Sequence, residues 1–137
     1  CGLLVYSSSW FGLPLPDAVS AQFSAQEHRF GIHAGEIETS MMLHLAPETV
    51  HMEHARDWRS TSQDRAERHA ILGNGKSAKM GWAMEDYHSA GAVGNAAAAS
   101  ADKGRAVVQA AGAALAQLLA ELHALPLSTL APRPGPP

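Results

Sequence analysis

The sequence GIHAGEIETSMML at residues 31–43 places a histidine and two glutamates beside a run of apolar side chains. The apolar residues recur at helical spacing, and a proline follows them, which disfavours helical backbone in the residue before it. We therefore predict a helix over residues 35–45. On this helix Glu38 lies on the face of the apolar residues, whereas Glu36 lies about 160° around the helical wheel and is predicted to face solvent.

His33 and Glu38 are the candidate chemical groups of this stretch. The first turn of a helix carries free N–H groups and a partial positive charge, which can stabilise developing negative charge. A histidine there can transfer a proton near neutral pH, and a glutamate one turn later can orient the imidazole or bind a metal ion. These groups suit hydrolysis of an amide-like bond. The alternative is structural, with Glu38 paired to a basic residue and no chemistry at His33.

The sequence LLVYSSSW at residues 3–10 begins with β-forming apolar residues and ends with three serines and a tryptophan. It is typical of a buried parallel strand whose carboxyl end opens onto a crevice, where α/β sheets bind their ligands. Trp10 then lies at the ligand-binding edge of the sheet. In the alternative interpretation the serines only end the strand, and Trp10 only packs against the core.

The segments around this region carry weaker patterns. A capping aspartate predicts a helix over residues 17–28, and alternating polarity predicts a short strand over residues 50–55. Residues 56–82 are polar and turn-rich, and we predict an extended loop with little local structure. The GNGK sequence at residues 73–76 is not a phosphate-binding P-loop, because the full spacing and the flanking strand are missing.

The clearest helix in the sequence follows Ser100. Ser100 is the predicted N-cap, Asp102 lies in the first turn, and Pro126 ends the helix. Apolar residues at intervals of three and four predict one buried face that covers a sheet, made of Val108, Ala111, Leu115, Leu118, Leu122 and Leu125. We expect the proline-rich residues 127–137 to form a disordered tail.

Composition narrows the class of protein. The 137 residues carry a formal net charge of −3 with both signs scattered, so the sequence shows no basic stripe for nucleic acid. No apolar run approaches the roughly 20 residues of a membrane span. The single cysteine, Cys1, excludes an intrachain disulfide and a cysteine zinc site, and it fits a cytoplasmic protein. The histidines other than His33 show no spacing that demands a metal, so we interpret them as structural or solvated.

Three stretches together resemble the creatininase family of metal-dependent amidohydrolases. HAGEIETSMML matches its signature His-Ala-Gly-X-X-Glu-Thr-Ser, with His33 first and Glu38 as the acid. VYSSSWFGLP at residues 5–14 is similar to the strand and tryptophan that precede the signature. VGNAAAASADKGRAVVQAA at residues 93–111 is similar to the closing stretch of the family, where a glycine-rich turn leads into an Ala/Asp-Lys-Gly helix.

The resemblance implies a fold, a reaction and roles for residues. The fold is a three-layer α/β/α sandwich with a mostly parallel sheet, assembled as a homohexamer. The reaction is hydrolysis of a C–N bond in a small amide, cyclic amide or formamide, with one or two divalent metal ions, Zn, Mn or Fe. His33 matches the catalytic histidine that shuttles a proton, and Glu38 matches the signature acid near the metals. Trp10 matches a tryptophan that packs on the substrate.

The sequence also departs from the family pattern. The main metal ligands of the family come from an ordered set: a Glu-X-His pair, a following aspartate and an Asn-Gly-His segment. This ordered set does not occur here, and Asn74–Gly75 is followed by Lys76. Residues 1–126 therefore match the carboxyl-terminal half of such a domain, with most metal ligands outside this chain and no expected activity in isolation.

The substrate and even the occurrence of catalysis stay open at this level. Creatininase itself has a Trp-Asp pair shortly before the catalytic histidine, whereas residues 29–32 here read RFGI. Relatives cleave a formamide in flavin and deazaflavin biosynthesis or trim a small peptide, and the sequence does not choose among these substrates. The alternative function is a non-catalytic interaction or scaffold domain with a creatininase-like fold.

Overall fold

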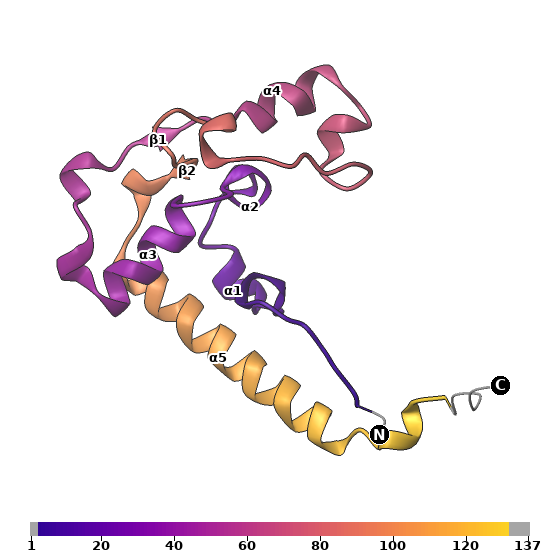
Figure 1. Cartoon of the computed structure of the whole chain (residues 1–137). Coiled ribbons are helices and arrows are strands. Elements are labelled where there is room, and N and C mark those ends of the chain that lie inside the picture. The colour runs from indigo at the N-terminus through magenta and orange to yellow at the C-terminus, as the bar shows by residue number, and fades with distance from the viewer. Residues whose placement is uncertain (1–2, 132–137) are drawn as a thin grey trace.

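A computed structural model describes residues 3–131 of the chain (Figure 1). In these residues helices dominate, and the sheet is small. The elements, in chain order, are α1 Asp17–Ser20, α2 Ala25–Phe30, α3 Glu36–Leu45, β1 Asp57–Trp58, α4 Thr61–Arg68, β2 Gly94–Asn95 and α5 Ala101–Ala124, joined by short 3-10 turns. The architecture is thus a mixed α/β one, in which α3 packs along the amino-terminal half of the long helix α5.

The helix predicted over residues 35–45 is confirmed as α3, with Gly35 at its N-cap. The predicted orientation of its two acids is wrong. Glu36 is only 5% exposed, whereas the side chain of Glu38 is 38% exposed. The reason is the neighbouring helix α5, whose Lys103 forms an ion pair with Glu36 and makes burial of that carboxylate tolerable.

The helix predicted after Ser100 is confirmed as α5. The Ser100 hydroxyl oxygen accepts a hydrogen bond from the Lys103 N–H at 3.4 Å, as expected of an N-cap. The prediction that this helix covers a sheet is wrong, because α5 covers no sheet in the described part of the chain and packs instead on α3. Its buried residues are Gly104, Val107 and Ala111. Of the predicted apolar face, Ala111 is buried and Leu115 is exposed.

The contact between α3 and α5 depends on two small residues. Ser40 of α3 is fully buried, and its hydroxyl oxygen accepts a hydrogen bond from the Ser100 N–H at 3.1 Å. Gly104 lies directly against the Ser40 carbonyl, so a Cβ at this position would overlap that group. Close backbone approach, rather than large apolar side chains, therefore holds the two helices together.

The described residues contain no parallel sheet. β1 and β2 form one short antiparallel pair, in which Asp57 faces Asn95 and Trp58 faces Gly94. The predicted strand at residues 3–10 is wrong: the segment forms no strand, and Val5 is 75% exposed, because nothing in the described chain pairs with it. A parallel three-layer sandwich is therefore not seen in this structure.

Three local predictions are also corrected. Residues 17–28 form two helices rather than one, because the Ser24 hydroxyl accepts the Glu27 N–H and starts α2 anew. The strand predicted over residues 50–55 is instead a 3-10 turn at Met52–His54. The predicted loop over residues 56–82 contains α4, whose N-cap Ser60 is buried.

Two features concern the end of the chain. The length and composition of α5 alone would allow it to cross a membrane, since its most apolar 18-residue window has a mean hydropathy of 1.2. A single helix of this kind is weak evidence, because core helices meet the same criterion. Leu127–Thr129 of the predicted tail forms a 3-10 turn, and residues 132–137 lie outside the described residues. The division into a domain and a disordered tail stays a prediction.

Candidate active site

The backbone at His33 is held by a segment that is distant from it in the sequence. The Val93 N–H donates to the His33 carbonyl oxygen at 2.9 Å, which forms an isolated antiparallel bridge. Val93 is fully buried. The glycine-rich turn before α5 thus holds the start of the signature in place, and the two most characteristic stretches of the sequence meet at His33.

The side chains of His33 and Glu38 contact each other. Glu38 Oε2 lies 3.2 Å from His33 Nδ1 and also accepts a hydrogen bond from the Ala34 N–H at 2.7 Å. A proton on Nδ1 satisfies the first contact, so the neutral tautomer leaves Nε2 free to accept a proton. The imidazole is 57% exposed, which leaves it accessible to a substrate. The spacing prediction that Glu38 can orient His33 matches this geometry.

Ala34 joins these two residues in an unusual conformation. Its φ is 53°, in the left-handed region that residues with a Cβ rarely adopt. The Thr39 hydroxyl donates to the Ala34 carbonyl at 3.2 Å, and Glu38 accepts the N–H of the same residue. Both polar groups of this strained backbone unit are therefore held by α3, a device that recurs at functional sites.

A cavity of about 300 Å³ opens beside these residues. Its wall combines His33 and Glu38 with apolar and hydroxyl-bearing neighbours and one more histidine: Ala34, Thr39, Met42, Thr49, Val50 and His51. The cavity can hold a small molecule against the imidazole. Within residues 3–131, no group of three or more His, Cys, Asp or Glu side chains is arranged to hold a metal ion. The residues present therefore do not make a complete metal centre.

A buried carboxylate that the sequence did not single out supports this site. Glu27 is only 3% exposed, and its two oxygens accept hydrogen bonds from the Ile37 N–H at 3.3 Å and the Asn95 N–H at 3.1 Å. It therefore joins the first turn of α3 to the turn before α5. Gly35 and Gly94 lie against the carboxylate, where a Cβ would clash with it. The glycines at 31, 35 and 94 were the available signal, but only the fold shows that they surround one side chain.

Replacement of Glu27 by glutamine is expected to lower the free energy of unfolding by about 1–2 kcal/mol. Glutamine has only one side-chain oxygen, so one of the two backbone N–H groups loses its acceptor and faces an amide NH₂ instead. Chemical unfolding followed by circular dichroism measures the effect. Glu48→Gln on an exposed residue is the matched control and should change little. Equal stability of the two variants would contradict the supporting role of Glu27.

The structure does not bring Trp10 to this cavity. Trp10 begins the 3-10 turn Trp10–Gly12, and its ring packs edge-on against Phe11, with ring centroids 6.0 Å apart. It does not line the cavity beside His33. The predicted contact of Trp10 with substrate stays a prediction. His28 has a structural role, since its Nε2 lies 2.8 Å from the Ser20 carbonyl oxygen.

The sequence profile of the creatininase family, described as creatinine amidohydrolase, matches residues 5–119 of the 137-residue chain. The match covers well over half of the chain, and the chain belongs to this family. Membership indicates a hydrolase of the amidohydrolase type. Neither a curated protein nor a solved structure gives a significant match.

Proposed function

We propose that this chain carries the proton-transfer half of a metal-dependent amidohydrolase that cleaves a C–N bond in a small amide, cyclic amide or formamide. The observation that carries the proposal is the contact of Glu38 Oε2 with His33 Nδ1 at 3.2 Å beside a cavity of about 300 Å³. Family membership supports the reaction type. The cavity suits a small substrate rather than a long polymer.

His33 acts as the general acid and base in this proposal. Glu38 holds Nδ1–H, so Nε2 accepts a proton from the attacking water and then delivers it to the leaving nitrogen. Glu38 also stabilises the imidazolium that forms between the two transfers. The hydrogen bond from the Ala34 N–H keeps the carboxylate in position throughout.

Metal dependence is supported by the family and not by the described residues. A divalent ion, Zn, Mn or Fe, would activate water and polarise the amide. Of the residues present, Glu38 is the proposed ligand, with its second oxygen, and the remaining ligands would come from outside this chain.

The predicted α/β/α sandwich and homohexamer also belong to the proposal. Support for the sandwich comes from the extended segment at the amino-terminal end of the described chain. Its apolar residues Leu3, Val5 and Tyr6 are exposed in this structure. Such a segment has the composition of a strand and lacks a partner among the described residues. We expect further strands to pair with it. Cytoplasmic localisation stays a prediction from the cysteine content.

A non-catalytic scaffold is the second candidate function. It is favoured by one observation, the absence of a metal-holding group within residues 3–131. The two candidates differ in metal content. If the chain is part of an amidohydrolase, elemental analysis of the protein purified at its natural length should find one or two divalent ions per chain. The same protein should hydrolyse a small amide, and a chelator should stop this hydrolysis. A metal-free protein without hydrolytic activity would establish the scaffold instead.

Glu38→Gln separates the two proposed roles of that acid. We expect turnover to fall by about 10- to 100-fold, as is usual when a group that orients or supports a metal site is lost. If Glu38 is a ligand, the bound metal content falls with it, and if it only orients His33, metal content is kept. Glu121→Gln, at an exposed acid near the end of α5 that does not line the cavity, is the control. Unchanged turnover would exclude both roles.

A further inference from the structure

A second and larger cavity, of about 640 Å³, lies between α2, α4 and residues 72–87. Four cationic side chains line it, and no acidic side chain is among the lining residues: the cations are Arg29, Arg65, Lys76 and Lys79. Three aromatic rings share the wall, those of Phe30, Trp82 and Tyr87. The cavity is therefore positively charged and lined by rings, although the chain as a whole is acidic.

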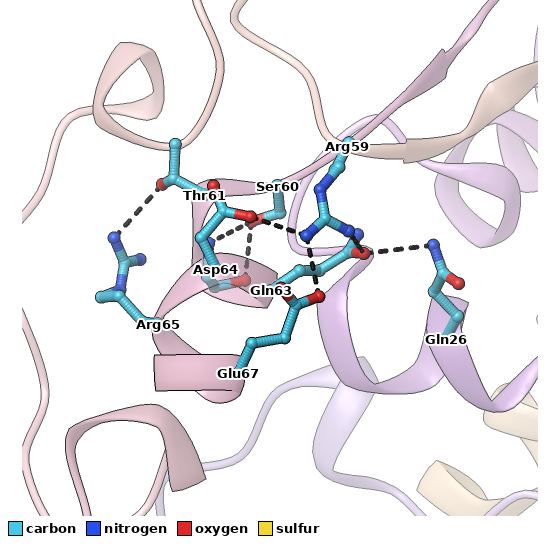
Figure 2. A network of polar contacts seen from close by, with 9 residues as sticks. Gln26, Arg59, Ser60, Thr61, Gln63, Asp64, Arg65 and Glu67 are labelled. Carbon is cyan, nitrogen blue, oxygen red and sulfur yellow. Dashed lines mark hydrogen bonds and ion pairs between the residues drawn. The ribbon is translucent and has the colours of Figure 1, made fainter. Parts of the chain in front are cut away.

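The two acids of α4 pair with a cation that does not line the cavity. Figure 2 shows Arg59 and Arg65 on opposite sides of α4. The Arg59 guanidinium forms ion pairs with both acids of α4, at 2.6 Å to Asp64 and 2.9 Å to Glu67. A hydrogen bond to Glu67, which has the larger effect, and another to Asp64 raise the pKa of the Arg59 guanidinium. Arg65 is left with a neutral partner, the Thr61 hydroxyl, at 3.2 Å.

Among residues 3–131, the other three cations of the cavity also lack an acidic partner. The Arg29 guanidinium donates to the Gly73 carbonyl at 3.5 Å, and no ion pair between described residues involves Lys76 or Lys79. Like charges gathered in one cavity repel each other, so an anion that enters it relieves repulsion as well as gaining hydrogen bonds.

The aromatic rings are arranged to leave an apolar surface beside the cations. Trp82 packs edge-on against Tyr87, with ring centroids 5.0 Å apart, and Trp82 is 48% exposed. The Arg65 guanidinium lies 5.0 Å from the centre of the Tyr87 ring. A planar ring can stack on such a surface, because aromatic faces and guanidinium groups both favour stacked partners.

The loop that carries Lys76 is preorganised. Asn74 Oδ1 accepts hydrogen bonds from the Lys76 N–H at 2.8 Å and the Ser77 N–H at 2.9 Å. Gly75 supplies the left-handed backbone that this turn requires, with a φ of 70°. This turn places Lys76 in the wall of the cavity.

We propose that this cavity binds a planar aromatic ring that carries a phosphate group, the chemistry of a nucleoside monophosphate. The phosphate pairs with the lysines and arginines, and the ring stacks beside Trp82. The site is distinct from the hydrolytic one, because the two cavities share no lining residue. Binding here does not depend on the proposed hydrolysis.

The test measures binding of AMP, adenosine and inorganic phosphate to the 137-residue chain by calorimetry and by tryptophan fluorescence. We expect AMP to bind about tenfold more tightly than adenosine or inorganic phosphate. One charge-assisted contact contributes about this factor in affinity. The double variant Lys76→Gln and Lys79→Gln should remove this advantage and leave adenosine binding unchanged. Both lysines are exposed, so folding should be preserved.

Arg105→Gln is the matched control, because Arg105 is an exposed cation on α5 that lies outside the cavity. Its AMP affinity should equal that of the unmodified chain. Equal affinity for AMP, adenosine and phosphate would overturn the proposal. So would a loss of AMP binding free energy in Arg105→Gln that is about half of the loss in the double lysine variant. Arg105→Gln removes one positive charge and the double variant removes two, so binding would then follow net charge alone.

Discussion

His33→Ala is expected to lower the turnover of the active protein, at its natural length, by about 10²–10⁴-fold, the usual contribution of a positioned general acid and base. The physical reason is the geometry at Nδ1. Glu38 lies 3.2 Å from this nitrogen and fixes the tautomer, so Nε2 is available for proton transfer. Alanine removes both the base that accepts the proton from water and the acid that protonates the leaving nitrogen.

The measurement is steady-state hydrolysis of small amides, with KM determined beside kcat. We expect the loss in kcat, since the proton moves only in the transition state. His123→Ala is the control, because this histidine is exposed near the end of α5, far along the helix from the contact with α3. Turnover of His33→Ala close to that of the unmodified protein would remove His33 from the mechanism.

Gly104→Ala is expected to lower the free energy of unfolding by about 3 kcal/mol, at the upper end of the range for overpacked sites. The added Cβ would overlap the Ser40 carbonyl, which belongs to the backbone of α3 and cannot rotate away. The helices must separate, and this weakens the ion pair of Lys103 with Glu36 and the Ser100–Ser40 hydrogen bond. Chemical unfolding followed by circular dichroism measures the loss.

The same helix supplies the matched control at Gly112. A Cβ there meets no atom within 4 Å. Gly112→Ala should therefore raise the free energy of unfolding by about 0.5–1 kcal/mol, because alanine is the better helix former. The two substitutions are chemically identical, so opposite signs isolate the contact with α3. A gain in stability in both variants would show that α5 does not pack as described.

The sequence predicted those parts of the fold that depend on local interactions. α3 and α5 were predicted near their observed bounds, because an N-cap, a helical run and a following proline act within one segment. The strands failed for the opposite reason. Residues 3–10 have the composition of a strand, but a strand exists only where another backbone pairs with it, and none of the described segments does so.

The candidate site was predicted in part for the same reason. His33 and Glu38 are five residues apart and meet across the start of one helix, so spacing alone suggested their contact. Glu27 was missed, because it acts on the Ile37 and Asn95 N–H groups, the second of which is distant in sequence. The proposed role of Trp10 has no such local partner to support it.

By itself the sequence determined the family, the two main helices and the pair of His33 with Glu38, because each rests on residues close together along the chain. Only the tertiary structure decided which acid of α3 is buried. Glu36 is inside because Lys103 meets it, and the periodicity of one helix carries no information about its neighbour. In the same way, cations that are scattered along the sequence line one cavity only because α2, α4 and the loop beyond α4 pack together.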